Sequence, residues 1–220
     1  MDTSAARQAI LGRIRKAQGR PAQPAPAERD AAAAYMAQHS AGPRPAFGSD
    51  LMLRFTEQAL RMSDTVEEVA VPGEVPTAVA RYLDAIGVAR KAIAWKTLEG
   101  MAWREAGVDV EFRPPRNEDL TGITGVFCAI AETGTLMLLS GADTYSSASL
   151  LPETHIAVVP VSRIVASMED AFALARAEHG ALPRAVNFIS GPSRTGDIEQ
   201  TIVLGAHGPY RVHVVVVRGE

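Results

Sequence analysis

The chain of 220 residues is long enough for one domain, or for one domain with a helical extension. Its apolar content of 47% and charged content of 21% are ordinary for a globular protein. The net charge of −3 offers no basic footprint for nucleic acid, and no apolar run is long enough to span a bilayer. The first residues lack the apolar core of a signal peptide, so we expect a cytoplasmic protein.

Helical patterns interrupted by proline dominate the first sixty residues. Apolar residues at helical spacing predict a helix over residues 4–18, which the proline-rich segment Pro21–Pro26 ends. A second helix is expected over residues 28–39, and a third begins after Ser49. We therefore interpret residues 1–62 as a helical N-terminal extension, which wraps the domain or docks a partner.

Strand and helix patterns alternate from Thr65 onward, which assigns residues 63–220 to an α/β domain. Such alternation predicts an open, largely parallel sheet flanked by helices. Two apolar runs, 125–131 and 135–139, flank a short turn and predict a β-hairpin. The other expected strands are 66–71, 92–95, 108–112, 155–160, 186–190 and 212–217, and the expected helices are 76–86, 98–105 and 163–178.

Glycines and polar residues gather in two neighbouring stretches, GPSRTGDIE at 191–199 and GAHGP at 205–209. A turn of this kind at the carboxyl end of a strand is where open α/β sheets usually place ligands. Backbone N–H groups and the Arg194 guanidinium suit a small carboxylate or phosphate. The alternative is a structural turn in which Thr195 or Asp197 caps a helix. The expected ligand-binding residues here are Ser190, Gly191, Ser193, Arg194, Thr195, Asp197, Glu199, Gly205 and Gly208.

Two further positions are candidates for acid–base chemistry. Glu132 precedes Thr133, Gly134 and Thr135 at the hairpin tip, where it could act as a general base while its neighbours contact a ligand. A solvated hairpin turn is the alternative. His207 lies between glycines, and an imidazole with an ordinary pKa near 6.5 suits proton transfer, although the turn could equally serve only to reverse the chain.

Cys128 is the only cysteine, which excludes a site in this chain that needs several thiolates. It lies in an apolar run, so we expect a buried, inert thiol. There is no phosphate loop ending in Gly-Lys-Ser or Gly-Lys-Thr, no GxGxxG after a strand, and no metal-ligand spacing of histidines with Asp197. We therefore expect neither a metal nor a bound cofactor in this chain.

The two glycine-rich stretches are similar to the signature of the LUD-domain family of lactate-utilisation proteins. Residues 125–135, residues 151–160 and the helical run from Arg163 also fit, and together the resemblance covers roughly residues 120–217 in the order that the family shows them. It implies a fold of the NagB/RpiA/CoA-transferase-like class. It also implies a part in the oxidation of L-lactate by a three-protein, iron–sulfur-dependent system.

The leading hypothesis is therefore an accessory subunit that binds the substrate carboxylate or scaffolds the complex. Its iron–sulfur clusters would lie on partner proteins, because this chain has one cysteine. The alternative is a self-sufficient ligase or acyl/CoA transferase of the cyclo-ligase-like fold class, with Glu132 as nucleophile or base. A third hypothesis is an interaction module that docks through the N-terminal arm.

Overall fold

The computed structural model describes residues 3–40, 42–196 and 203–219. The chain divides into two compact units, Met1–Pro43 and Arg44–Glu220. This boundary lies before the expected one at residue 62, because helix α3 (Leu51–Arg61) buries Phe55 and Ala59 in the core of the second unit. No helix among the described residues combines the length and the apolar character needed to cross a membrane.

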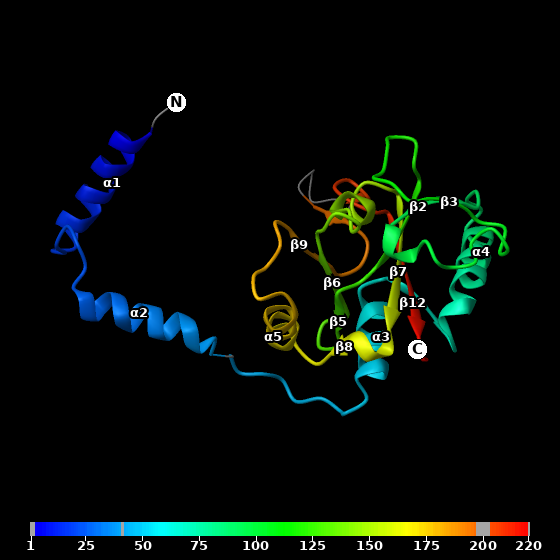
Figure 1. Cartoon of the computed structure of the whole chain (residues 1–220), viewed down its shortest axis with the longest axis horizontal. Coiled ribbons are helices and arrows are strands. Elements are labelled where there is room, and N and C mark those ends of the chain that lie inside the picture. Colours follow the sequence, from blue (N-terminus) through cyan, green and yellow to red (C-terminus); the bar gives the residue numbers. More distant parts are fainter. Residues whose placement is uncertain (1–2, 41, 197–202, 220) are drawn as a thin grey trace. The chain divides into compact units, whose positions relative to one another are not determined.

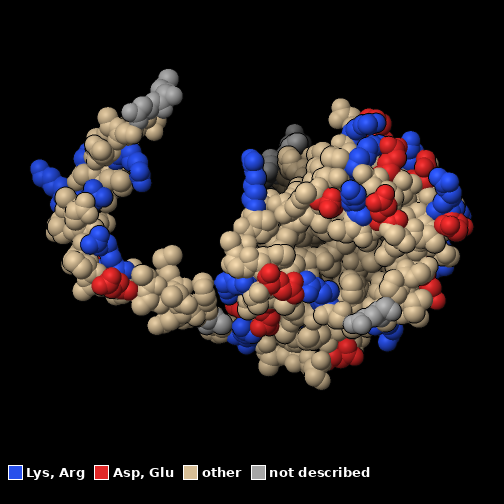
Figure 2. Space-filling view, in the orientation of Figure 1, with Lys and Arg blue, Asp and Glu red and all other residues tan. Residues whose placement is uncertain are grey.

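The described residues of the first unit form two helices, and neither helix has a buried residue. Helix α1 (Ser4–Ala17) and helix α2 (Pro26–Gln38) are the two helices that the sequence predicts, and a proline-rich turn separates them. Arg20 and Glu28 form an ion pair of 2.9 Å beside that turn. Basic side chains predominate on this unit in Figure 2, whereas acidic and basic side chains are interspersed on the second unit.

A six-stranded parallel sheet forms the centre of the second unit, in the order β1-β12-β7-β4-β2-β3 (Figure 1). This confirms the predicted fold class. The valine-rich strand β12 pairs with β1 on one side and with β7 on the other, so its backbone N–H and C=O groups are hydrogen-bonded on both sides. The strands are β1 (Thr65–Val69), β2 (Lys91–Ala94), β3 (Asp109–Glu111), β4 (Thr121–Gly125), β7 (Thr154–Pro160) and β12 (Arg211–Val217).

The alternation of side chains along β12 supplies apolar groups to two separate cores. Val215 and Val217 face helix α4 (Val75–Ala85), which packs with Val79 and Leu83 on one face of the sheet. On the other face, Val212, Val214 and Val216 pack against α3 and a second sheet. The sheet is therefore covered on both faces, as its apolar strands require.

The second sheet has the order β8-β5-β6-β9 and contains the predicted hairpin. Its strands are β5 (Cys128–Ile130), β6 (Thr135–Leu139), β8 (Ile164–Val165) and β9 (Val186–Ile189). Helix α5 (Met168–His179) covers it, and Ser167 starts that helix with a capping box to Asp170. A short pair, β10 (Arg194–Thr195) and β11 (Val203–Leu204), precedes β12. The described part of the chain also contains 3₁₀ turns at Pro72–Glu74, Lys96–Leu98, Ser146–Ser149 and Val161–Arg163.

Three local expectations were wrong. The helix expected at 98–105 is only the 3₁₀ turn Lys96–Leu98, and the Trp103 indole donates to the Leu98 carbonyl that a longer helix would use. The helix expected from Arg163 starts at Met168, because the β-branched pair Ile164–Val165 extends beside β5 as strand β8. Strand β4 was missed, since Thr-Gly-Ile-Thr-Gly carries little apolar pattern.

Candidate functional site

The hairpin tip between β5 and β6 lies against the last turn of α3. Gly134 has a φ of +69°, and a Cβ atom there would lie 2.4 Å from the Ala59 nitrogen. Only glycine permits both this backbone conformation and this approach. Gly134 is therefore required at this turn, and the turn determines the positions of the neighbouring threonines.

Three hydroxyl groups, two from the hairpin tip and one from the end of strand β9, form a chain of hydrogen bonds. Thr133 Oγ1 lies 2.7 Å from Thr135 Oγ1, which lies 2.6 Å from Ser190 Oγ. Strands β6 and β9 produce this meeting, because Leu136 pairs with Ile189 in their antiparallel register. Thr135 is buried, whereas Thr133 is exposed. The structure thus joins two stretches that are more than fifty residues apart in the sequence.

The turn after β9 also contacts α3. Gly191 has a φ of +83°, and a Cβ atom there would lie 2.2 Å from the Met62 carbonyl oxygen. Arg194 Nη2 donates to the same carbonyl at 3.3 Å and also to Ser63 Oγ. An arginine at the carbonyl end of a helix is favourable, since it satisfies a carbonyl that lacks an intrahelical partner. Part of the stretch therefore has a structural role in holding the end of α3.

Asp64 follows Ser63 in the chain and is the residue that the sequence interpretation missed. The residue is 3% exposed, and neither carboxylate oxygen has a hydrogen-bond partner among the described residues. Burial raises the pKa of Asp64 from 3.8 to about 7, and the positive charge of Arg194 opposes that rise. A carboxyl group that titrates near neutral pH is a candidate for proton transfer. No motif indicated it, because an acid between a helix and a strand usually caps a turn.

Residues 205–209 fold onto the described part of the other stretch, residues 191–196, at Ser193. The Ser193 nitrogen donates to the Pro209 carbonyl, and the Gly205 nitrogen donates to the Ser193 carbonyl, both at 2.9 Å. The His207 nitrogen donates to Ser193 Oγ at 3.3 Å. A Cβ atom at Gly208 would lie 3.2 Å from Ser193 Cβ. These contacts join the described residues of the two stretches into one unit.

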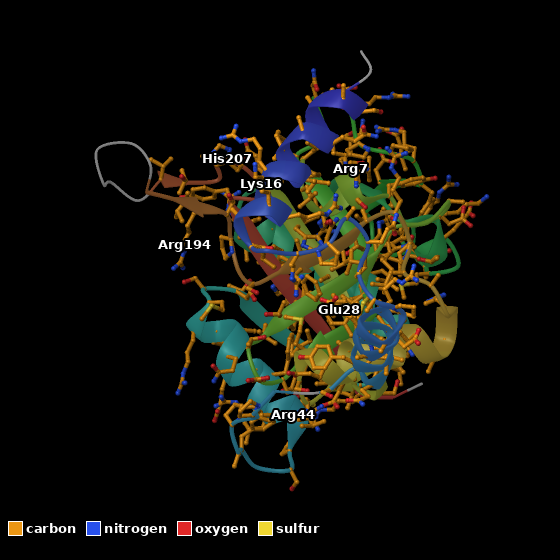
Figure 3. All side chains as sticks on the ribbon, turned by 90° about the vertical axis from the view of Figure 1, so that its left-hand side faces the viewer. Arg7, Lys16, Glu28, Arg44, Arg194 and His207 are labelled. Atoms are coloured by element: carbon orange, nitrogen blue, oxygen red, sulfur yellow. The ribbon has the colours of Figure 1, made fainter. Side chains whose placement is uncertain are left out.

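The remaining candidates lie around this unit without converging on one atom. The His207 side chain is exposed, and it projects from the same part of the chain as Arg194 (Figure 3). Glu132 is half-buried, and its backbone nitrogen donates to the Ala166 carbonyl at 3.0 Å. Thr195 pairs with Val203 in the β10–β11 ladder. Asp197 and Glu199 lie outside the described residues.

The position of this site in the fold differs from the expectation. Strand β9 belongs to the second sheet, so the turn after it does not lie at the carboxyl end of a strand of the parallel sheet. Instead, residues 205–209 lead into the amino end of β12, and Asp64 precedes the amino end of β1. The sequence shows that a strand ends at residue 189, but its sheet is decided by its pairing with β6.

Two histidines and the expected buried thiol are packed elsewhere in the fold. His155 Nε2 lies 2.8 Å from Thr124 Oγ1, and burial lowers the pKa of His155 to about 4. Burial also lowers the pKa of His213 to about 4, and its ring stacks on Tyr82 with centroids 3.8 Å apart. Cys128 is buried, which raises its thiol pKa to about 11. Within the described ranges, no three His, Cys, Asp or Glu side chains are grouped so as to hold a metal ion.

These features define an open α/β protein with a second, smaller sheet and a glycine- and hydroxyl-rich turn packed on helix α3. The model of the LUD domain family matches residues 2–217, and the chain therefore belongs to the LUD domain family. A solved structure of a DUF162 family protein from Deinococcus radiodurans superimposes with a TM-score of 0.57 at 27% identity. That match covers 79% of this chain and 99% of the other.

Curated relatives carry the name lactate utilization protein C. One from Shouchella clausii is 33% identical over 186 residues, which cover 76% of this chain and 79% of the relative. One from Halalkalibacterium halodurans is 44% identical over 99 residues, covering 44% of this chain and 43% of the relative. One from Bacillus licheniformis is 37% identical over 118 residues, covering 52% and 49%. The match thus spans about half the length or less of the last two relatives.

Proposed function

We propose that this chain takes part in lactate utilisation as an accessory subunit of an iron–sulfur-dependent oxidation of L-lactate. The relatives named lactate utilization protein C, at 33% to 44% identity, support the process. The accessory role is inferred from the cysteine content, because one buried thiol cannot supply the ligands of an iron–sulfur cluster. The clusters would then belong to partner proteins in the same system.

We further propose that a small anion binds at the turn that carries Arg194. The observation that carries this proposal is the buried carboxyl of Asp64, whose charge interacts with that of Arg194. Neither oxygen of this carboxyl has a hydrogen-bond partner among the described residues. A buried carboxyl without a hydrogen-bond partner lowers the stability of the fold, and a role in ligand binding would explain why this one is present. An anion that attracts Arg194 would weaken the positive field at Asp64, so Asp64 would take up a proton as the anion binds.

The other predicted residues have places in this proposal. The hydroxyl chain from Thr133 to Ser190 and the turns at Ser193 and Thr195 would supply hydrogen bonds to the anion. The backbone N–H groups of the nearby glycines would add to them. Glu132 and His207 remain the candidates for acid–base chemistry if the complex uses this chain catalytically.

The anion site is tested by thermal shift with L-lactate and with inorganic phosphate. An anion should stabilise wild type and also the control variant Arg104→Ala, which changes an exposed arginine ninety residues before Arg194. It should not stabilise Arg194→Ala. Stabilisation by L-lactate, which carries the same charge at both pH values, should be larger at pH 6 than at pH 8, because Asp64 is protonated at the lower pH. Equal stabilisation of wild type and Arg194→Ala would refute the site.

The process is tested in cells of the source organism grown on lactate. The tagged full-length chain should co-purify with iron–sulfur proteins, and the eluate should reduce a dye when L-lactate is added. The chain alone should not reduce the dye. A solitary, inactive chain would contradict the accessory role, and dye reduction by the chain without partners would show an independent enzyme.

A further inference from the structure

A cavity of about 640 Å³ lies at the opposite edge of the parallel sheet from Arg194. Gly125, Pro160 and Val217, which line it, are the last residues of strands β4, β7 and β12. Among the described residues of the two stretches, 190–196 and 205–209, none lines it. It is therefore separate from the anion site, which lies where β1 and β12 begin.

The strand connections explain why the sheet is open at this edge. Within the parallel sheet, the strand that follows β2 in the chain is its outer neighbour β3. The strand of this sheet that follows β4 is β7, on the other side of β4, and the chain reaches it through β5 and β6 of the second sheet. The direction of the connections within the sheet therefore reverses between β2 and β4. Leu98, which follows β2, and Val126, which follows β4, line the cavity between them. Open α/β sheets place ligands in the crevice that such a reversal creates.

The cavity is mainly apolar, with a few polar groups at its rim. Aliphatic side chains such as Leu98, Val126 and Val161 form its walls. The polar side chains that line it are Ser162, Arg163 and Arg218. A pocket of several hundred Å³ with apolar walls and a few convergent polar groups is typical of small-molecule sites. A molecule as small as lactate would leave most of this volume empty.

The two arginines differ in how far their donors are already used. Arg163 donates through Nε to the Phe127 carbonyl at 2.8 Å and through both terminal nitrogens to Glu178. Arg218 donates to Glu68 through Nε at 2.9 Å and through Nη2 at 2.5 Å. A guanidinium has further N–H donors on its other terminal nitrogen. Arg218 is also the more exposed of the two, with 60% of its side chain accessible compared with 31%.

We propose that this cavity binds a second ligand, an organic carboxylate with an apolar chain longer than that of lactate. The chain lies against the aliphatic walls, and the carboxylate accepts hydrogen bonds from Arg218. Because this site shares no residue with the Arg194 turn, it stands or falls independently of the proposed anion site.

Calorimetric titration of the full chain tests the proposal, with decanoate as the probe and decanol as its uncharged match. Decanoate is kept below the concentration at which it forms micelles, and decanol below its solubility limit. Ser162→Trp fills the cavity from an exposed position and should weaken decanoate binding at least about tenfold. Arg218→Gln should weaken decanoate binding about tenfold and leave decanol binding unchanged. Arg194→Ala should bind decanoate as wild type does.

The outcomes distinguish the two sites. Failure of wild type to bind decanoate, or equal binding by wild type and Ser162→Trp, would overturn the cavity as a ligand site. Equal binding by wild type and Arg218→Gln would overturn the assignment of the carboxylate. Thermal unfolding followed by circular dichroism checks that each variant is folded, and Val126→Phe replaces Ser162→Trp if that variant is not. Loss of decanoate binding in Arg194→Ala would show that the probe binds at the anion site instead.

Discussion

The buried carboxyl of Asp64 should make the stability of this protein depend on pH in a way that one substitution removes. The pKa of Asp64 is raised by burial from 3.8 in the unfolded chain to about 7 in the folded protein. Between these two values the folded state binds more protons than the unfolded state, so the free energy of unfolding falls as pH rises. The contribution of Asp64 to the free energy of unfolding is fully present below pH 3.8 and is lost as pH rises to about 7.

The size of this effect follows from the two pKa values. Each pKa unit corresponds to about 1.4 kcal/mol, so the difference between 3.8 and about 7 amounts to about 4 kcal/mol. In Asp64→Asn the side chain is neutral at every pH. The variant should therefore be more stable than wild type at pH 8, by about 4 kcal/mol at most, and close to wild type at pH 4.

Urea unfolding of wild type and Asp64→Asn at pH 4, 6 and 8 measures this difference. Asp109→Asn, which changes an exposed aspartate, is the matched control and should follow wild type at each pH. Other groups that titrate in this range affect wild type and variant alike, so only their difference matters. A constant difference between wild type and Asp64→Asn from pH 4 to pH 8 would refute the raised pKa, and with it the proposed proton uptake on anion binding.

Two further substitutions test local features of the structure. Gly191→Ala should lower the free energy of unfolding by about 2–5 kcal/mol, because alanine disfavours a φ of +83° and its Cβ would lie 2.2 Å from the Met62 carbonyl oxygen. The control Gly196→Ala has open space around it and should cost far less. Similar thermal midpoints for the two variants would contradict the close approach at Gly191. Ser167→Ala removes the capping box of α5 and should cost about 1 kcal/mol in urea unfolding, whereas Ser162→Ala should change stability by less than about 0.5 kcal/mol.

The position of Arg194 shows how structural and functional roles combine in this site. Its guanidinium supports the end of α3 through Met62 and Ser63, and its charge also acts on the pKa of Asp64. If Arg194 only held the helix, Arg194→Ala would lower stability equally with and without an anion. A loss of anion-dependent stabilisation beyond that cost is what the proposed function requires.

Local patterns in the sequence were sufficient for most of the individual elements. The alternation of strands and helices predicts a parallel sheet, and two apolar runs around Glu132–Thr135 predict the hairpin. The requirement for glycine at residue 134 also follows from the turn chemistry. These predictions succeed because periodicity and turn propensity depend on residues close together in the chain.

Only the tertiary structure decided which elements meet. Strand β9 joins the second sheet through its register with β6, so the turn that carries Arg194 lies at the amino ends of β1 and β12. Asp64 is buried because α3 packs on the sheet and because the turn after β9 reaches Met62 and Ser63 from more than 130 residues away. Pairing and burial are set by such distant contacts. The sequence therefore determined which residues form the turns, and the packing determined the pKa of Asp64 and the edge of the sheet at which each proposed site lies.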